Sequence, residues 1–365
     1  MQSRSNQART DTESTPASPS EQRPDGDSGR STRQTEQCSV VVVTYNHEAY
    51  IASCLTSVLE GSPGEIFVVD GGSSDDTREI VRTQFPDVTL IEADHNPGYG
   101  ECNNIGVAQA SGEYVLVLNP DTHIEPGSIE ALLQPLAEDE GPDVTTPKIL
   151  QYDGSAINTC GNINHMTGLT FVQGFDDDPG EWDEETQLTG ISGACFAMKR
   201  QDFEEIGGFD SSIFLYMEDA ELSWRLSAFG NEIRFVPEAI VYHDYDDVEV
   251  PESKLGHLEE GRYTILKKYL DRRTAALLLP SLLMAEILSF GYAVLLGWSG
   301  LKHKLGAIRS GLEAEPEPVE VESETLVRAL DSEIPVGQLG SSLPALTCQR
   351  IANLVFRANY RLIER

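Results

Sequence analysis

Residues 65–77 read EIFVVDGGSSDDT, a short apolar run that ends at Asp70 and passes into a turn rich in Gly, Ser and Asp. An uninterrupted apolar run of this length is typical of a strand that is buried on both faces. Ser74 or Asp75 can cap a helix that starts just after the turn. The segment therefore predicts one unit of strand, turn and helix.

The same unit repeats on both sides of this stretch. Apolar runs that end in polar turns lie at 38–46 (CSVVVVTYN), 88–93 (VTLIEA) and 112–121 (GEYVLVLNPD), and segments with helical spacing separate them. Strands that alternate with helices predict an α/β fold, with a Rossmann-like, mostly parallel sheet flanked by helices. In such sheets, ligands bind at the carboxyl ends of the strands.

Polar residues at those strand ends have the chemistry that a nucleotide requires. Asp70 can accept a hydrogen bond from a base N–H, and Gly71 lets the backbone approach a ligand closely. Asp121 can hold Mg²⁺ or Mn²⁺, which prefer oxygen ligands, and Asn119 points to the same side of its strand. Each residue alone is a weak signal, because Asp-Gly and Asn-Pro-Asp also end strands in ordinary turns.

The chain is strongly acidic, with 60 Asp and Glu against 26 Lys and Arg and a formal net charge of −34. This charge opposes binding to nucleic acid. It suits a protein that stays soluble in very high salt, so we expect a halophile's cytosol; the alternative is an unusually acidic protein from ordinary salt. The six cysteines form no C-x-x-C pair, which favours a reducing compartment without a disulfide framework or zinc site.

The two ends of the chain differ from its middle. The N-terminal residues are polar and have no apolar core, so we expect disorder there and no secretory signal. The C-terminal part holds a long apolar run, an acidic Pro-containing stretch and a helix whose polar positions are arginines. The predicted organisation is a disordered tail (1–36), an α/β domain (37–250), a helical region (251–310), an acidic linker (311–344) and an amphipathic basic helix (345–365).

The apolar run at 275–298 is long enough to span a bilayer. Glu286 near its centre and Pro280 argue against an ordinary span, since a carboxylate there is costly. An interfacial helix or hairpin that lies on the membrane is one alternative, and a buried core helix is the other. Basic residues on both sides suit anionic headgroups on the cytoplasmic face, so we expect membrane contact.

One acidic pair stands apart from this general acidity. Glu218 and Asp219 lie in LYMEDAELSWRL (215–226), among large apolar side chains and at the start of a predicted helix. In so acidic a chain, such a pair could be ordinary solvated surface. A dry apolar wall would instead raise the pKa of a carboxylate towards a range that is useful for catalysis. Glu221, which follows the pair, is expected on the helix surface or as a capping partner.

Seven ordered motifs between residues 38 and 245 resemble family 2 glycosyltransferases of the GT-A fold, and most closely their rhamnosyltransferase-like branch. They are VVVTYN (41–46), VVDGGSSDDT (68–77), HNPGYGECNNIGV (95–107), YVLVLNPDT (114–122), ISGACFAMKR (191–200), GGFDSSIFLYMEDAELSWRL (207–226) and VYH (241–243). The sequence has no Q-x-x-R-W motif, which counts against a processive polysaccharide synthase.

The resemblance implies roles for individual residues. The nucleotide and its sugar would be bound by Thr44, Asn46, Asp70, Gly71, Asn96, Gly98, Tyr99, Asn103 and Asn119. Asp121 matches the metal-binding carboxylate of the D-x-D motif, although Asn119 replaces the first acid of that motif. His243 matches a histidine that can complete the metal site; from the residues alone, a buried strand-end histidine is the plainer interpretation.

The resemblance also implies a mechanism and a setting. Asp219 would be the general base of an inverting transfer, with Glu218 in support, while Mg²⁺ or Mn²⁺ stabilises the departing diphosphate. One sugar would move from a dTDP-, UDP- or GDP-linked donor to a saccharide acceptor, lipid-linked in view of the C-terminal segment, at the cytoplasmic face of the membrane. The alternatives are an inactive nucleotide-sugar-binding protein and a sugar nucleotidyltransferase.

Overall fold

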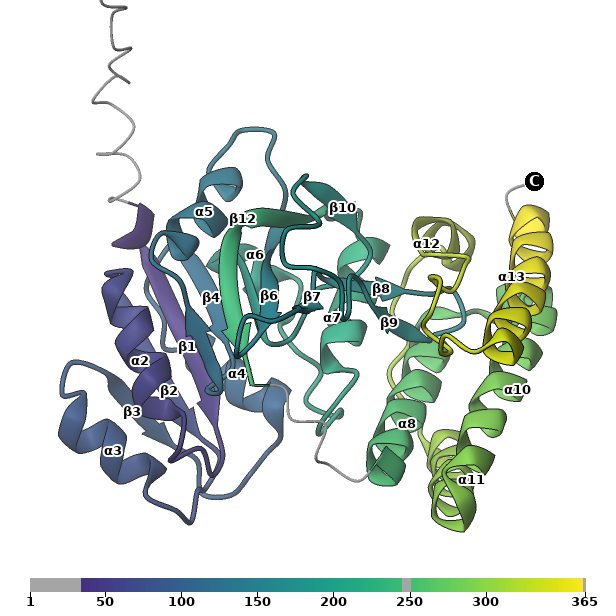
Figure 1. Ribbon diagram of the computed structural model, residues 1–365, viewed down its shortest axis with the longest axis horizontal. Helices are drawn as coiled ribbons and strands as arrows, with labels where there is room; N and C mark the ends of the chain where they lie inside the picture. Colours follow the sequence, from purple (N-terminus) through teal and green to yellow (C-terminus); the bar gives the residue numbers. More distant parts are fainter. Residues whose placement is uncertain (1–33, 245–250, 364–365) are drawn as a thin grey trace, which may run out of the picture.

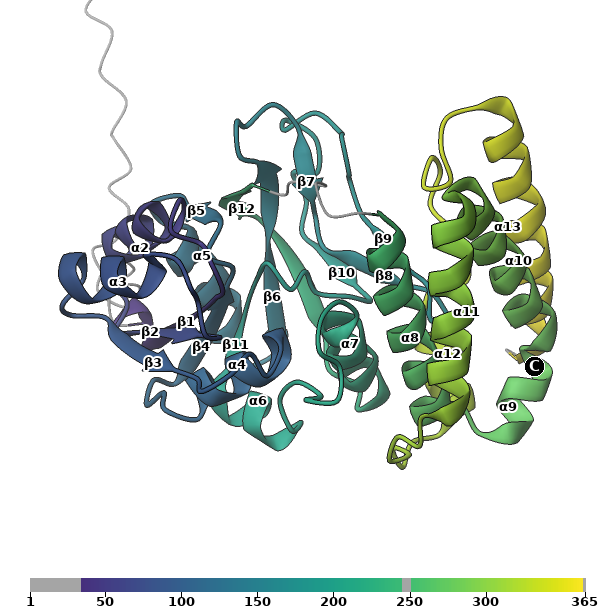
Figure 2. The same cartoon turned by 90° about the horizontal axis from the view of Figure 1, so that it is seen from below.

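The computed structural model describes residues 34–244 and 251–363. A ten-stranded sheet with helices on both faces forms one part of the molecule, and a group of C-terminal helices packs beside it (Figures 1 and 2). Most of the predicted tail, together with Arg365, lies outside the described residues.

Strand β1 (Cys38–Thr44) lies inside the sheet, and all of its residues are buried. It pairs in parallel with β2 (Glu65–Asp70) on one side and with β4 (Tyr114–Leu118) on the other. Because helices cover both faces of the sheet, the side chains that point to either face are apolar. This burial explains why the sequence shows an unbroken run of valines instead of an alternating pattern.

The helices divide between the two faces. The apolar core on one face joins β1 to helices α2 (Ile51–Glu60), α3 (Thr77–Gln84) and α5 (Ser128–Leu136). The core on the other face joins it to α4 (Tyr99–Val107), α6 (Arg200–Glu205) and α7 (Glu218–Ala228). The predicted sheet flanked by helices is therefore confirmed.

The sheet is mixed rather than parallel throughout. Its order is β10 (Thr186–Leu188), β12 (Ile233–His243), β6 (Val144–Gln151), β11 (Cys195–Lys199), β4, β1, β2 and β3 (Thr89–Glu92); β5 (Thr122–Ile124) also pairs with β12, and β7 (Ile157–Thr159) with β6. The first four strands in the chain are parallel, as predicted, whereas β11 runs antiparallel to both β4 and β6.

The reversal of β11 has a consequence for the position of its N-terminal end. Cys195, its first residue, pairs with Leu118, the last residue of β4. The residues just before β11 therefore lie at the carboxyl edge of the parallel strands, where ligands bind in such sheets. Alternating segments of strand and helix do not reveal this reversal, because strand direction depends on the path of the intervening loops.

The C-terminal part consists of α8 (Pro251–Tyr269), α9 (Arg272–Leu277), α10 (Leu279–Leu295), α11 (Gly297–Glu313), α12 (Ser323–Ala329) and α13 (Leu343–Ile363). A third apolar core joins these helices, except α11, to Met166 and Trp224 of the sheet-based part. A small ribbon of β8 (Asn162–Asn164) and β9 (Thr170–Val172) reaches towards them. The stretch expected to be an acidic linker, 311–344, contains α12, which packs against α7.

The apolar run at 275–298 is not one helix. It begins in α9, continues through α10 and breaks at Gly297, whose φ of 75° is open to glycine but strained for other residues. None of the helices in the two described ranges is both long enough and apolar enough to cross a membrane.

Glu286, which lies in this run, is paired rather than isolated. Its carboxylate accepts hydrogen bonds from Arg262 and from the Tyr263 hydroxyl at 3.0 Å, and it lies 2.9 Å from the Lys304 ammonium. Arg262 and Lys304 also bond to buried Glu259. The charge that argued against a membrane span is thus part of an ionic cluster between α8, α10 and α11.

Candidate active site

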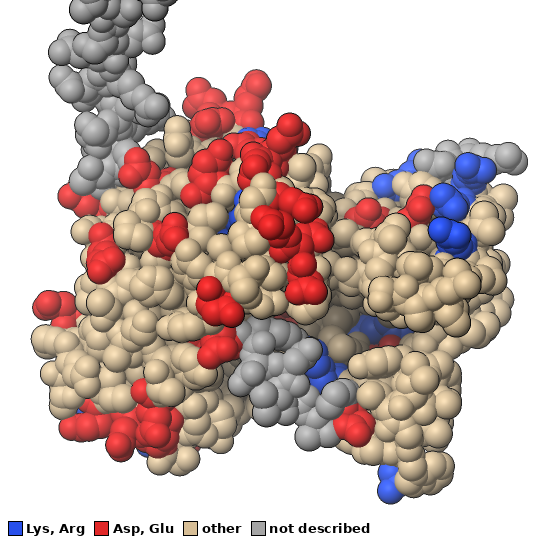
Figure 3. Space-filling model, viewed as in Figure 1, with Lys and Arg blue, Asp and Glu red and all other residues tan. Residues whose placement is uncertain are grey.

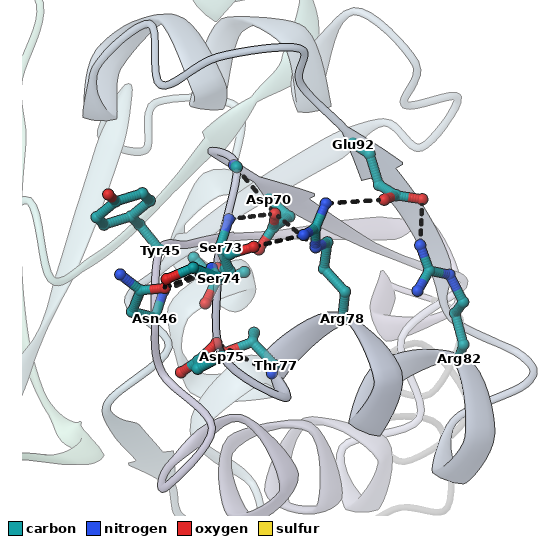
Figure 4. Close-up of polar contacts among 12 residues, drawn as sticks. Tyr45, Asn46, Asp70, Ser73, Ser74, Asp75, Thr77, Arg78, Arg82 and Glu92 are labelled. Carbon is teal, nitrogen blue, oxygen red and sulfur yellow. Dashed lines mark hydrogen bonds and ion pairs between the residues drawn. The ribbon is translucent and has the colours of Figure 1, made fainter.

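Asp70 ends β2 and is fully buried. Its Oδ1 accepts hydrogen bonds from the backbone N–H groups of Gly72 at 3.0 Å and Ser73 at 2.8 Å, and the Arg78 guanidinium lies 3.6 Å away (Figure 4). Its Oδ2 is buried and has no hydrogen-bond partner. One carboxylate oxygen is therefore fixed by the turn, and the other is left for a ligand.

The loops that follow β1 and β2 are bonded to each other. The backbone N–H of Asn46 donates to the Ser73 hydroxyl at 2.8 Å, and the Asn46 amide oxygen accepts from the backbone N–H of Ser74 at 2.7 Å. Gly71 donates its N–H to the carbonyl of Thr44 at 2.8 Å. The Tyr45 ring, 48% exposed, lies beside this junction in Figure 4.

The segment from Asn96 to Asn103 closes over this edge of the sheet. Asn96 accepts the N–H of Gly98 at 3.0 Å, and a Cβ at Gly71 would lie only 3.3 Å from the Asn96 side chain. Gly98 has a φ of 101°, and a Cβ there would lie 2.5 Å from a backbone oxygen. Close approach therefore requires glycine at position 98 and leaves little room for a side chain at position 71.

Tyr99 and Asn103 continue this segment on α4. The Tyr99 hydroxyl donates to the carbonyl of Gly193 at 2.6 Å, and Asn103 donates to the carbonyl of Tyr99 at 3.1 Å. The Asn103 Oδ1 is buried without a partner. Burial, followed by the charge of Glu218, holds the pKa of Tyr99 well above its usual range, so this hydroxyl stays a hydrogen-bond donor.

Asn119, Asp121 and His243 meet where β4 and β12 end. The His243 Nε2 lies 3.3 Å from Asp121 Oδ1 and 3.4 Å from the Asn119 amide nitrogen. The Asn119 Oδ1 is buried and has no partner. Burial raises the pKa of Asp121, but the hydrogen bond from His243 and the His243 charge outweigh it, and the pKa falls below its usual value.

This group fits a divalent cation through a carboxylate oxygen, an amide oxygen and an imidazole nitrogen. Within the described part of the chain, no three His, Cys, Asp or Glu side chains come together as a metal-binding group. The donor set therefore depends on Asn119, which replaces the first acid of the predicted motif. Asn119 supplies an amide oxygen beside Asp121 that has no hydrogen-bond partner.

Glu218 and Asp219 begin α7 after an unusual turn. Tyr216 and Met217 both have left-handed backbones, with φ of 60° and 69°. Two consecutive non-glycine residues in this region are strained, which is characteristic of functional sites. The turn directs both carboxylates inward at the positive end of the helix.

The two carboxylates have different surroundings. Asp219 Oδ2 accepts from Asn162 and from the N–H of Gly193, both at 3.2 Å, and its Oδ1 accepts from the N–H of Ala220 at 2.8 Å. Glu218 Oε2 is buried with no partner. Burial and the Asp219 charge raise the pKa of Glu218 to about 8, and burial also raises the pKa of Asp219.

Residues 192–194 connect the groups of this site. The carbonyl of Ala194 accepts the N–H of Asn119 at 2.9 Å, and Gly193 bonds to both Asp219 and Tyr99. This tripeptide precedes the reversed strand β11. The structure thus brings the predicted strand-end residues, the α4 segment and the acidic pair to one edge of the sheet.

Comparison with known proteins gives the family of this chain. The pattern of glycosyl transferase family 2 matches residues 39–207. The chain is 30% identical over 234 residues to an N-acetylglucosaminyl-diphospho-decaprenol L-rhamnosyltransferase of Mycobacterium tuberculosis, which covers 57% of this chain and 76% of that protein. It is 27% identical over 198 residues to a low-salt glycan biosynthesis hexosyltransferase of Haloferax volcanii, covering 52% and 61%.

The chain belongs to glycosyltransferase family 2. It is therefore a transferase of sugars.

Solved structures share the fold of this glycosyltransferase at low sequence identity. GalNAc-T7, crystallised with UDP, GalNAc and Mn²⁺, superposes with a TM-score of 0.54 and 17% identity, covering 76% of this chain and 55% of that one. Residues 1–349 of Staphylococcus aureus TarS give a TM-score of 0.50 and 18% identity, covering 90% of each chain. The architecture is a GT-A-like mixed α/β fold.

Several residues of this glycosyltransferase that lie in the site were not predicted from the sequence. Asn162 contacts Asp219 from the ribbon strand β8, and no local pattern marks it. His47 Nδ1 lies 3.5 Å from the hydroxyl oxygen of Thr44 at the end of β1, and burial lowers the pKa of His47 although the charges of Asp121 and Asp75 oppose this. For Tyr45, the available signal was an aromatic residue directly after a predicted strand.

One sequence expectation on α7 is wrong. Glu221 was expected on the helix surface or as a capping partner, yet it is fully buried. Its carboxylate accepts hydrogen bonds from Arg225, from the Lys268 ammonium at 2.5 Å and from the Tyr269 hydroxyl at 2.7 Å. Glu221 therefore links α7, which carries the acidic pair, to α8 through these hydrogen bonds.

Proposed function

We propose that this protein is an inverting, metal-dependent glycosyltransferase that moves one sugar from a nucleoside-diphosphate sugar to a lipid-linked saccharide. The observation that carries this proposal is a set of buried, unpartnered oxygens along one edge of the sheet: Asp70 Oδ2, Asn119 Oδ1 and Glu218 Oε2. Buried polar atoms without partners are rare, because each costs about 1–3 kcal/mol. Their alignment along one edge favours a polar ligand that satisfies them together.

The donor nucleotide would occupy the edge formed by the loops after β1 and β2. Asp70 Oδ2 would accept a hydrogen bond from the base, and the exposed Tyr45 ring offers a surface on which a base can stack. Thr44, Asn46 and Gly71 shape this loop junction, and the segment around Asn96, Gly98, Tyr99 and Asn103 would cover the sugar and diphosphate.

Asn119, Asp121 and His243 would hold Mg²⁺ or Mn²⁺. The bound cation would neutralise charge on the departing diphosphate. The low pKa of Asp121 keeps its carboxylate ionised over the physiological range, as a ligand for such a cation must be. GalNAc-T7, which shares the fold, was crystallised with Mn²⁺.

The acidic pair would act on the acceptor. We assign Asp219 as the general base, because three donors fix the direction of its carboxylate and burial raises its pKa. Asp219 takes the proton of an acceptor hydroxyl while that oxygen forms a bond to the anomeric carbon. The bond from that carbon to the diphosphate breaks on the opposite side, which inverts the configuration. The unpartnered Glu218 oxygen would position the acceptor.

The C-terminal helices would place this reaction at the cytoplasmic face of a membrane. Large apolar side chains are exposed on α10, α11 and α13, and we call them the apolar face: Leu279, Leu283, Ile287, Val294, Leu295, Trp298, Leu305, Leu312, Ile351, Leu354 and Leu362. Glu286 is the single acid in 272–312, against five Lys and Arg. Figure 3 shows acidic side chains crowding the sheet-based part and basic ones gathered over α13.

Equilibrium binding of UDP, dTDP and GDP tests the donor site. We expect one of them to bind tightly only when Mn²⁺ or Mg²⁺ is present. Asp121→Asn should weaken metal-dependent binding by about tenfold or more, and Asp70→Asn should weaken binding with or without metal. Asp76→Asn, an exposed neighbour, is the control and should bind like the wild type. Equal affinity in EDTA would contradict the metal assignment.

A further inference from the structure

A groove of about 330 Å³ runs between α8 and α11, outside the site described above. Its walls carry His257, Lys302 and His303 together with the hydroxyl groups of Ser253 and Ser310. A single acid, Glu260, joins this lining. In a chain with 60 acidic and only 26 basic residues, a solvent-accessible groove lined by one lysine, two histidines and one acid stands out.

One end of the groove borders the loop that carries the acidic pair. The His257 ring lies 6.2 Å from the ring of Tyr216, and the Lys254 ammonium lies 5.6 Å from the same ring. Tyr216 precedes Glu218 by two residues. A Cβ at Gly261 would lie 2.5 Å from the Met217 side chain, so α8 packs closely against this turn.

The other side of the groove borders the apolar face. The Lys302 ammonium, which lines the groove, lies 5.8 Å from the ring of Trp298. Trp298 is 69% exposed, and Leu305 on the same helix is 55% exposed. An exposed Trp beside Lys is typical of the interface between apolar and aqueous phases. The groove therefore lies between the acidic pair and an apolar surface.

We propose that this groove binds the phosphate group of the lipid-linked acceptor, an inference that rests on the proposed function. An acceptor whose sugar hydroxyl reaches Asp219 and whose hydrocarbon chain lies on the apolar face carries its phosphate between the two. Ammonium, imidazole and hydroxyl groups are suitable donors to phosphate oxygens. The Lys302 ammonium is the fixed cation in this lining, and a local cation is needed because a net charge of −34 repels an anionic acceptor.

Calorimetric binding of farnesyl diphosphate tests this inference, in EDTA so that no divalent cation draws the diphosphate to Asp121. The variant is Lys302→Gln with His303→Gln, and its matched control is Arg309→Gln. Arg309 lies on the same helix, is exposed and pairs with Glu313 outside the groove. We expect about tenfold or greater loss of affinity in the double variant and unchanged affinity in the control.

Two further probes separate the sources of affinity, at one fixed salt concentration. Farnesol, which lacks phosphate, should bind at least about tenfold more weakly than farnesyl diphosphate; equal affinities would overturn the proposal. Phosphatidylglycerol vesicles present a phosphate in a headgroup. If the double variant loses vesicle binding but keeps its affinity for farnesyl diphosphate, the groove contacts the membrane and the acceptor role is overturned.

The outcome for the groove is separate from the outcome for the donor site. The double variant should bind the donor nucleotide like the wild type, because the groove residues lie on other elements than Asp70 and Asp121. Loss of donor binding in the double variant would show a general structural defect and overturn the assignment of a local phosphate site. If the wild type binds farnesyl diphosphate in the groove yet binds no nucleoside diphosphate, the proposed function fails, and the groove keeps its assignment as a phosphate-binding site.

Discussion

Glu218 and Asp219 are two adjacent carboxylates in a buried position, and that arrangement is costly. Burial raises both pKa values, and the charge of Asp219 raises that of Glu218 further, to about 8. The strained turn at Tyr216 and Met217 adds to this cost. A raised pKa makes a carboxylate a stronger base, which suits the proposed role of Asp219 in taking a proton from an acceptor hydroxyl. The pair therefore lowers the stability of the fold, as expected if its role is the proposed catalytic one.

The first prediction follows from the raised pKa of Glu218. Its pKa in the folded protein, about 8, lies above 4.5, the ordinary value for a glutamate in an unfolded chain. Proton binding thus favours folding, and this contribution is complete below pH 4.5 and lost as the pH rises through 8. Glu218→Gln cannot ionise, so its free energy of unfolding relative to wild type should rise by about 1–3 kcal/mol between pH 6 and pH 9.

Urea unfolding at both pH values measures this difference. Exposed Glu313, replaced by Gln, serves as the control and should show the same difference from wild type at pH 6 and pH 9. If the difference in free energy of unfolding between Glu218→Gln and wild type is also the same at both pH values, the pKa of Glu218 is not raised in the folded protein.

At the scale of residues, the order of motifs along the chain predicts part of the site. Strand ends predicted that Asp70, Asn119 and Asp121 would share an edge, and the structure places them there. Asn162 was missed because its contact with Asp219 spans 57 residues, and no periodicity records such a contact. The burial of Glu221 was missed for the same reason, since its partners Lys268 and Tyr269 come from another helix.

At the scale of elements, the helical region shows why hydropathy alone misjudged the apolar run. A carboxylate in an apolar helix is costly only while it lacks partners, and Glu286 has three, on α8 and α11. Small residues on α10, including Ser281 and Ala285, face the other helices, whereas large ones such as Leu283 and Ile287 are exposed. The run therefore packs as one side of a bundle with an exposed apolar surface.

The second prediction concerns this ionic cluster. Glu286→Gln removes the charge that Arg262 and Lys304 share, and both cations are buried. Removing one partner from a buried group of charges typically costs about 3–5 kcal/mol. We expect chemical denaturation to show a loss of that size in the free energy of unfolding. If the helices unfold apart from the sheet, their separate unfolding step should disappear.

Exposed Glu313 again supplies the matched control. It pairs with Arg309 on the surface, so Glu313→Gln should change the free energy of unfolding by less than about 0.5 kcal/mol. Similar small effects for both variants would contradict a stabilising role for the Glu286 cluster.

At the scale of the whole molecule, charge is unevenly distributed. Acidic residues crowd the sheet-based part in Figure 3, whereas residues 272–312 contain one acid. The total composition predicted an acidic protein suited to high salt, but it could not show where the exceptions lie. Likewise, the alternation of strands and helices predicted the α/β class, while the reversal of β11 depends on long loops without a pattern.

The third prediction is that salt stabilises the fold. With a net charge of −34, repulsion among surface carboxylates opposes folding, and salt screens it. The melting temperature should rise by about 5 °C or more between 0.1 M and 2 M KCl. Differential scanning calorimetry measures this shift, with sorbitol at matched water activity as the control. A melting temperature that is independent of KCl would remove the case for a halophilic protein.

The central claim is that this family 2 glycosyltransferase uses Asp219 as the base of a metal-dependent transfer. The most direct measurement is nucleoside-diphosphate release from UDP-, dTDP- and GDP-sugars in molar KCl with Mn²⁺ or Mg²⁺, for the wild type and Asp219→Asn. We predict metal-dependent release from one donor by the wild type and about 10²–10⁴-fold slower release by the variant, with unchanged donor affinity. Release by the variant at the wild-type rate, or an equal loss of donor affinity, would contradict the claim.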